Sequence, residues 1–338
     1  MNHYAGIDVS LKESHVCVVD ASGKILREGK VASEPEDLIG WFGGLGLVVT
    51  RIGLEAGPLS QWLYAALRDA GLAIELLETR HVRNALRIMP VKTDRKDAQG
   101  IAELMRLGWF RPVHCKSMEA QETRAMLTAR KLVQKMLHEL EMNLRGVLRG
   151  FGLKVGKTTP VTFEARIREL VAGHPSLEGI AQSLLAARAV LRRELNGFEK
   201  RLRAIARCDT RARLLTSVPA VGTIVALTYV SAIDDPARFK SSKIVGAYFG
   251  ITPKKYQSGE TDRSGGISKI GDASVRAALY ESAHIMLTKP IKGCTALKAW
   301  AMRIAKRAGM NKAKVALARK LAVIMHRMLA DGTTFTPA

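Results

Sequence analysis

The order of short apolar runs in the first 110 residues is the feature that most constrains the fold. Three runs rich in β-branched residues, separated by turn signals such as Ala21-Ser22-Gly23, predict three consecutive strands. Helical and strand-like patterns then alternate up to a final helix. The predicted elements are strands 3–9, 14–20 and 24–31, helix 35–42, strand 47–55, helix 58–70, strand 73–77 and helix 94–107.

Three meandering strands followed by this alternation is the element order of a ribonuclease-H-like fold. We therefore predict an α/β domain of that class for residues 1–112. In such a fold the first strand supplies a central aspartate, the fourth strand an acidic residue and a late helix the remaining acids.

Four carboxylates occupy those places. Asp8 and Glu55 each end an apolar run, and Asp94 and Asp97 stand three residues apart at a predicted helix start, on one face. Carboxylate oxygens suit Mg²⁺ or Mn²⁺, and two such ions roughly 4 Å apart clamp the attacking and leaving oxygens of a phosphodiester displacement. The pattern predicts a catalytic metal site made of all four. The alternative is a set of unrelated surface or capping residues, with Asp94 as the N-cap of its helix.

The charge of the chain points to a polyanionic partner. The 338 residues include 53 Lys+Arg and 31 Asp+Glu, a formal net charge of +22. Residues 1–100 carry 12 basic and 13 acidic side chains, whereas residues 101–338 carry 41 and 18. A neutral part with carboxylates for metal, followed by a basic part that holds phosphates, is the division expected of a nucleic-acid enzyme.

Beyond the first domain the sequence predicts mostly helix. Apolar residues step by three and four over 119–150 and 177–206, with a loop rich in Gly and Lys at 150–160. We assign 113–210 to a helical, coiled-coil-like connector whose two helices pair with each other or with a second subunit.

Residues 211–338 form the third predicted part, mostly α-helical. A turn at Pro219–Gly222 precedes a predicted helix at 223–233 and resembles a helix-hairpin-helix element, with Ala220 where a glycine is usual. A polar loop is predicted for 254–272. Helices follow over 273–328, interrupted at Pro290 and Gly309.

No signal for a membrane or for zinc accompanies these patterns. There is no apolar run near 18 residues and no signal-peptide pattern, so we expect a soluble, cytoplasmic bacterial protein. The four cysteines lack the paired spacing of zinc sites, and the eight histidines show no ligand pattern.

Five motifs along the chain belong together. In order they are Gly6-Ile7-Asp8, Leu54-Glu55-Ala56, Lys92-Thr93-Asp94-Arg95-Lys96-Asp97-Ala98, Ser217-Val218-Pro219-x-Val221-Gly222 and Tyr248-Phe249-Gly250-Ile251-Thr252-Pro253-Lys254-Lys255-Tyr256-Gln257-Ser258-Gly259. This set resembles the insertion-sequence-110 family of bacterial DEDD transposases. The resemblance covers nearly the whole chain.

The resemblance implies a resolvase-like first domain with the four carboxylates as its DEDD tetrad and a C-terminal transposase domain whose catalytic serine is Ser258. It also implies that this serine attacks DNA to form a phosphoserine link. The tetrad of a partner subunit completes the centre, which requires a homo-oligomer, a dimer or tetramer. A structured non-coding RNA, encoded in the flanks of the element, guides the choice of target and donor DNA.

The residues around Ser258 fit a nucleophile, although an ordinary turn serine is the simpler interpretation without the family. Nearby cations hold a scissile phosphate and stabilise developing charge. Ser264 and Ser268 are the competing hydroxyls, and the segment from Ser268 to Asp272 reads as a helix cap and phosphate contact. The predicted nucleic-acid-binding residues are Lys240, Lys243, Lys254, Lys255, Arg263 and Lys269.

Three other functions compete with a DNA transposase. A Holliday-junction-type endonuclease would use the carboxylates alone and leave Ser258 dispensable. A sugar kinase of the actin-like fold also begins with a Gly-Ile-Asp-like turn, but it needs a second glycine-rich phosphate loop that this sequence lacks. A non-catalytic nucleic-acid-binding protein would need only the basic part.

Overall fold

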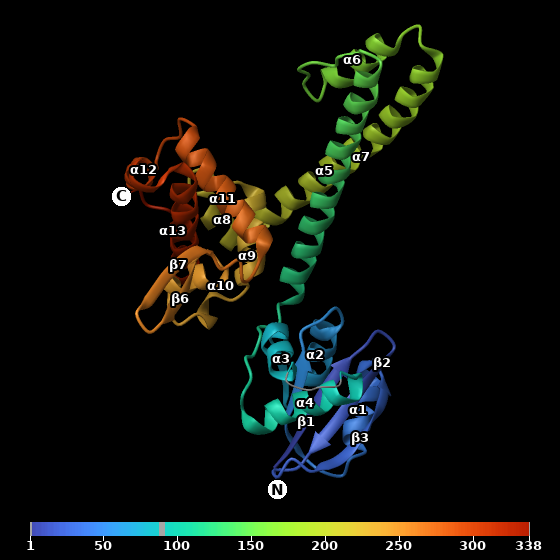
Figure 1. Cartoon of the computed structure of the whole chain (residues 1–338), viewed down its shortest axis with the longest axis vertical. Helices are drawn as coiled ribbons and strands as arrows, with labels where there is room; N and C mark the ends of the chain where they lie inside the picture. The colour runs from blue at the N-terminus through green and yellow to red at the C-terminus, as the bar shows by residue number, and fades with distance from the viewer. Residues whose placement is uncertain (1, 88–91, 338) are drawn as a thin grey trace. The chain divides into compact units, whose positions relative to one another are not determined.

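The computed structural model describes residues 2–87 and 92–337. The chain forms two compact units, Met1–Lys116 and Ser117–Ala338 (Figure 1). The first carries 15 basic and 14 acidic residues, and the second carries 38 and 17. The excess of positive charge therefore belongs almost wholly to the second unit.

The first unit is a mixed α/β domain built on a five-stranded sheet with strand order β3-β2-β1-β4-β5. The central strand β1 is antiparallel to β2 and parallel to β4, which in turn is parallel to β5. The elements are β1 (His3–Val9), β2 (Glu13–Val19), β3 (Ile25–Ala32), α1 (Pro35–Gly43), β4 (Val49–Glu55), α2 (Ser60–Asp69), β5 (Ile74–Leu77), α3 (Thr79–Leu86) and α4 (Asp94–Leu107). The predicted α/β class is confirmed, and so is the order of the elements apart from α3, which was not predicted.

Helices cover both faces of this sheet. Successive residues of a strand point to opposite faces, so β1 contributes Ile7 to one core and Tyr4 to the other. Helices α1 and α2 pack on the first face, and α3 and α4 on the second. Helix α3 was not predicted: it has eight residues, and Val82 is the one buried residue among them.

The second unit begins with two long helices that pair antiparallel within the chain. They are α5 (Met118–Gly150) and α7 (Pro175–Cys208), with the shorter α6 (Thr162–Val171) between them in sequence. Arg130 Nη2 lies 2.7 Å from Glu199 Oε1, and Arg188 Nε lies 2.7 Å from Glu141 Oε1, which fixes the antiparallel register. Of the two predicted pairings, the structure has the one within the chain. Helix α6 falls beyond the predicted loop and was not expected.

A helical core completes the second unit. Its elements are α8 (Thr210–Thr216), α9 (Thr223–Ile233), the 3₁₀ turns η1 (Pro236–Arg238) and η2 (Ser242–Ile244), α10 (Val245–Tyr248), α11 (Ala273–Thr288), α12 (Thr295–Ala308) and α13 (Met310–Asp331). Helix α9 has the predicted bounds and lies at the centre, buried from Ala226 to Ile233. The predicted break at Gly309 separates α12 from α13. None of the described helices is long and apolar enough to cross a membrane.

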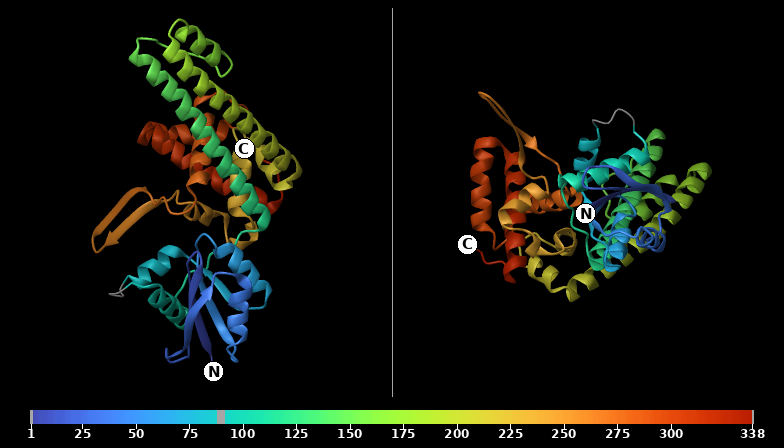
Figure 2. Two further views of the ribbon diagram at one scale, coloured as in Figure 1. Left: turned by 90° about the vertical axis from the view of Figure 1, so that its right-hand side faces the viewer. Right: turned by 90° about the horizontal axis from the view of Figure 1, so that it is seen from below.

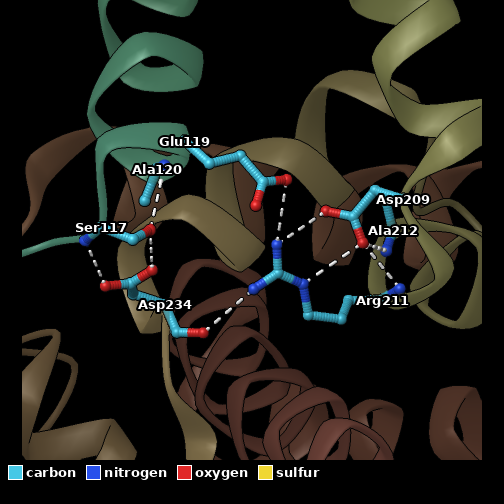
Figure 3. A network of polar contacts seen from close by, with 7 residues as sticks. All are labelled: Ser117, Glu119, Ala120, Asp209, Arg211, Ala212 and Asp234. Atoms are coloured by element: carbon cyan, nitrogen blue, oxygen red, sulfur yellow. Dashed lines mark hydrogen bonds and ion pairs between the residues drawn. The ribbon is translucent and has the colours of Figure 1, made fainter.

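A polar network ties the start of α5 to α8 and α9 (Figure 3). Ser117 donates from its backbone N–H and its hydroxyl to the Asp234 carboxylate, at 2.8 and 2.6 Å. The Arg211 guanidinium donates to Asp209, to Glu119 and to the Asp234 carbonyl oxygen. Asp234 keeps a left-handed φ of 62°, which is uncommon without glycine, because these bonds fix it there.

The predicted polar loop at 254–272 is wrong over most of its length. Residues Pro253–Ser258 (β6) and Thr261–Ile267 (β7) form an antiparallel hairpin that projects from the helices (Figure 2). Both faces are exposed apart from Ile267, so no apolar alternation marks the strands. The two-residue turn after Ser258 has Gly259 at φ 54°, a conformation that glycine adopts without steric cost.

Candidate active site

Asp8 and Glu55 lie at the same end of two neighbouring strands. In the parallel pairing of β1 with β4, Ile7 stands opposite Leu54, so the next residue of each strand carries its carboxylate at the same sheet edge. Both line a cleft of about 300 Å³, together with backbone and side chains of the segments that follow each strand. The two strand-end acids are therefore brought together as predicted.

Close packing of α4 on the sheet brings in the other two acids. A Cβ on Gly6 would lie 2.2 Å from the Ala98 carbonyl oxygen and 2.4 Å from the Ala102 nitrogen. A Cβ on Gly53 would lie 2.7 Å from the Ile101 side chain. Only glycine at these positions lets the helix approach β1 and β4 so closely.

Asp94 is not the N-cap of α4, the role that was the alternative interpretation of this residue. The Thr93 hydroxyl caps α4 by accepting a hydrogen bond from the Lys96 N–H at 3.2 Å. Asp94 is the first helical residue, with a side chain 61% exposed, whereas the Asp97 side chain is 17% exposed. Asp97 lies deeper in the site, and its carboxylate is 3.9 Å from Lys92 Nζ.

The carboxylates are close enough for their charges to act on one another. Burial, followed by the negative charges of Asp97 and Asp94, raises the pKa of Asp8 to about 6. Burial and the charges of Asp8 and Asp97 raise the pKa of Glu55 as well. Carboxylates that are buried and repel one another favour a proton or a cation between them.

The donor set fits hard divalent cations, because all four groups supply carboxylate oxygens. Over residues 2–87 and 92–337, no three His, Cys, Asp or Glu side chains lie close enough to hold an ion as they stand. Asp8 and Glu55 form the cleft wall, and Asp94 and Asp97 are not among the residues that line it. Metal binding at all four would thus require side-chain movement at the start of α4.

His15 is a neighbour of the site that the sequence did not reveal. It stands opposite Asp8 in the pairing of β1 with β2, and its Nδ1 lies 4.0 Å from Asp94 Oδ2. Its positive charge, when protonated, lowers the pKa of Asp8, as does that of Lys92. Strand register, which links residues 8 and 15, was the missing information.

Ser258 is in the second unit, at the end of β6. It stands opposite Thr261, and Tyr256 stands opposite Arg263. Because side chains alternate along a strand, Ser258, Tyr256 and Arg263 share one face of the hairpin. Lys255 and Ser264 pair on the other face, which separates the competing hydroxyl of Ser264 from Ser258.

The predicted nucleic-acid-binding cations occupy different settings. Lys255 Nζ is 3.0 Å from the Asp262 carboxylate, so its charge is compensated. Lys269 has a left-handed φ of 56°, and its N–H donates to the Gly250 carbonyl. Lys240 and Lys243 flank the start of η2 and are exposed. Lys254 and Arg263 lie in the exposed hairpin.

The predicted helix cap after the hairpin is confirmed at Asp272. Its carboxylate accepts from the N–H groups of Ser274 and Val275 at 2.8 and 3.2 Å and pairs with Arg124 at 2.6 Å. Arg124 and these hydrogen bonds outweigh burial and lower the pKa of Asp272. The Ser268 hydroxyl accepts from the Ile270 N–H at 3.4 Å and is part of this turn.

Comparison with known proteins gives two family matches. A model of the DEDD group of IS110 elements, described as transposase, matches residues 5–152, and one described as transposase of the IS116/IS110/IS902 family matches residues 212–297. The transposase for insertion sequence element IS1111A of Coxiella burnetii is 28% identical, over 98% of this chain and 90% of the relative. A probable family 20 transposase of Pseudomonas aeruginosa is 25% identical, over 85% and 86%.

A solved structure also matches. It is the T. thermophilus RuvC in complex with a Holliday junction substrate, with a TM-score of 0.26 and 14% identity. The match covers 33% of this chain and 100% of that one.

Proposed function

Because the chain belongs to the IS116/IS110/IS902 family of transposases, we propose that its first unit cuts and exchanges DNA strands with divalent metal ions held by Asp8, Glu55, Asp94 and Asp97. The observation that carries this proposal is the convergence of Asp8 and Glu55 at the same end of two paired strands, where both line one cleft. Burial and the charges of Asp97 and Asp94 raise the pKa of Asp8 to about 6, which is consistent with that convergence. Repulsion of this kind is relieved when a cation binds. Because the relatives are transposases, which are enzymes, we set aside the role of a non-catalytic nucleic-acid-binding protein.

The protein's own part in this site is to gather and orient oxygen ligands. Asp8 and Glu55 are fixed by the sheet register, and Asp94 and Asp97 by the contact of α4 with Gly6 and Gly53. Bound Mg²⁺ or Mn²⁺ would polarise a phosphodiester and stabilise the leaving oxygen. Lys92 and His15 would adjust the net charge of the ligand set.

The second half of the proposal assigns the nucleophile to Ser258. Its Oγ gives up a proton and attacks phosphorus, one P–O bond of the DNA backbone breaks, and the departing oxygen takes a proton to become a free hydroxyl. The phosphodiester is exchanged for a phosphoserine ester, so no water or oxidant is consumed. The reverse attack by a second DNA hydroxyl then joins strands. Arg263, on the face of Ser258, is the cation placed to stabilise the charged phosphate.

The proposed partners follow from charge and family. The second unit, with 38 basic and 17 acidic residues, provides the surface for DNA and for a structured guide RNA. A homo-oligomer, dimer or tetramer, would bring the carboxylates of one subunit to the serine of another. Sedimentation with and without the RNA encoded beside the gene measures both properties.

Strand exchange between two labelled duplexes that carry the element ends and a target tests the proposal. Asp8→Asn, Glu55→Gln, Asp94→Asn and Asp97→Asn should each abolish exchange in Mg²⁺ and keep DNA affinity, because binding depends on the basic unit. Asp69→Asn, an exposed aspartate at the end of α2, is the matched control and should keep activity. Full exchange by Asp8→Asn would overturn the metal-site assignment.

The alternative function, a junction-type endonuclease, is favoured by one observation. The cleft with Asp8 and Glu55 lies wholly in the first unit and needs no group from the hairpin. In that case water attacks phosphorus, free ends accumulate, and Ser258→Ala keeps full cleavage. The same assay distinguishes the two functions by its products.

A further inference from the structure

Helices α12 and α13 and the C-terminal segment form a second charged region outside the proposed centre. From Thr295 to Asp331 the sequence has nine Lys and Arg residues, and Asp331 is the one acidic residue. The family models match residues only up to 297. This concentration of positive charge is therefore not explained by the shared motifs.

A groove of about 690 Å³ runs between these helices and the C-terminal segment. Trp300 and Arg303 of α12 and Lys320 and Arg327 of α13 line it. Lys320 Nζ lies 4.3 Å from the centroid of the Trp300 ring, so the ammonium covers one face of the indole, and the partly buried ring also packs against the helical core. Arg327 pairs with Asp331 at 3.2 Å. The groove thus combines an aromatic surface with an excess of positive charge.

The C-terminal segment is held in place as one wall of the groove. The Phe335 N–H donates to the Ser217 hydroxyl at 2.9 Å, and the Thr333 N–H donates to the Met328 carbonyl at 3.1 Å. The Phe335 side chain packs against the helical core. Figure 1 shows α12, α13 and the C-terminus together at one side of the unit. A groove with fixed walls binds without first having to be ordered.

We infer that this groove binds an unpaired stretch of nucleic acid. A base stacks on Trp300 and displaces the Lys320 ammonium toward the neighbouring phosphate, while Arg303 contacts the next phosphate. Aromatic platforms beside cations are the general means of holding single strands, because every base has a π-face. In a duplex the bases stack on one another, so π-faces are free only at the two terminal pairs. The inference rests on the nucleic-acid partner of the proposed function and involves neither the four carboxylates nor Ser258.

Fluorine NMR of the full-length protein labelled with 5-fluorotryptophan tests the inference directly. The chain has four tryptophans, Trp41, Trp62, Trp109 and Trp300, and Trp300→Phe assigns the signal of interest. Oligo-dT and oligo-U of ten nucleotides should shift or broaden the Trp300 resonance, and a blunt duplex of the same length, with free base faces only at its ends, should do so much less. Comparison of the two oligomers shows whether DNA or RNA is preferred. Binding of both oligomers with the Trp300 signal unchanged would overturn the inference.

Affinity measurements with charge variants provide an independent test. Arg303→Ala with Lys320→Ala should reduce the salt dependence of oligo-dT binding by about 1.4 in log–log slope, because each phosphate contact on a single strand contributes about 0.7. The control pair, Lys306→Ala with Lys312→Ala, removes equal charge from the same helices outside the groove lining. Equal effects of the two pairs would show non-specific attraction and contradict a defined groove.

Substitutions at position 300 that keep or remove the aromatic ring test whether a base stacks there. Trp300→Leu should weaken oligo-dT binding about tenfold, within the range that base stacking contributes, and Trp300→Phe should restore most of it. Strand exchange measured in parallel keeps the two proposals separate. Loss of oligonucleotide binding with carboxylate-dependent cleavage intact supports the groove as a separate site, whereas unchanged affinity in Trp300→Leu would contradict it.

Discussion

The carboxylate site and the β6–β7 hairpin hold their functional groups by opposite means. Asp8 and Glu55 follow Ile7 and Leu54, which are fully buried, and α4 contacts β1 and β4 without space for a methyl group. Ser258 ends a strand whose residues are all exposed, in a hairpin held by its own ladder. Core packing positions the first site, whereas turn geometry and backbone pairing position the second.

This difference suggests a division of tasks. Acids that repel one another need a rigid support, because the structure must keep them together against their own charge. A serine that attacks DNA, the role proposed for Ser258, has to reach a large ligand, and an exposed hairpin end offers access. Changes that disturb packing should thus affect the carboxylate site, and changes of charge should affect the hairpin and the basic unit.

The largest expected effect comes from salt and tests the contrast in charge between the two units. Binding of a structured nucleic acid should weaken by ~10³-fold or more between 50 and 200 mM salt if some six phosphates are neutralised. Electrophoretic mobility shift at several salt concentrations measures it. Asp8→Asn should show the same slope, because the first unit is nearly neutral. A change below about tenfold would mean that few phosphates are contacted.

The next largest effect should come from a substitution that disturbs the packing of α4 beneath the carboxylates. Gly6→Ala places a Cβ 2.2 Å from the Ala98 carbonyl oxygen, which forces α4 away and should lower the free energy of unfolding by about 3 kcal/mol. Gly29→Ala in β3 is the matched control, since its Cβ would meet Trp41 at 3.6 Å, an ordinary contact. Urea denaturation compares them. Equal stability of both variants would contradict the close approach of α4.

Substitution of two cations of the hairpin should change the rate of strand exchange by different amounts, because the strand register puts them on opposite faces. Arg263→Ala should reduce strand exchange roughly 30-fold, as expected for loss of a charge that stabilises the transition state. Lys255→Ala should cost less than about fivefold, because Lys255 is on the opposite face and pairs with Asp262. Initial rates at saturating DNA separate the two. A larger effect from Lys255 would reverse the assignment of the faces.

The smallest effect concerns the stability of the metal-free protein. Because the pKa of Asp8 is about 6 in the folded state against an ordinary 3.8, ionisation destabilises the fold as pH rises between these values. Asp8→Asn should therefore be more stable by about 1 kcal/mol at pH 7.5, a value reduced for the half-exposed position, and no more stable below pH 4. Thermal unfolding at both pH values measures this.

Added Mg²⁺ is the control for this last effect. It should raise the melting temperature of the unmodified protein by relieving the repulsion, and it should raise that of Asp8→Asn less. Equal stability of the two proteins across the pH range would show that Asp8 is not under electrostatic stress.

The sequence predicted the parts of the molecule where burial leaves a pattern. Strand β1 and helix α9 were placed with their observed bounds, and the four carboxylates were located from strand ends and helix spacing. The hairpin was not predicted because its strands lack a buried face, and α3 was not predicted because Val82 is its one buried residue. His15 was not predicted as a neighbour of the site because only the strand register places it opposite Asp8.

The most direct test of the central claim is to locate the bond between protein and DNA. Cleavage reactions stopped in denaturant, digested and analysed by mass spectrometry should yield a nucleotide attached to Ser258. Ser258→Ala should give no adduct, whereas Ser264→Ala, on the other face of the hairpin, and Tyr256→Phe, on the same face, should keep it. A nucleotide on Tyr256, or metal-dependent free ends with no adduct in the unmodified protein, would contradict the account.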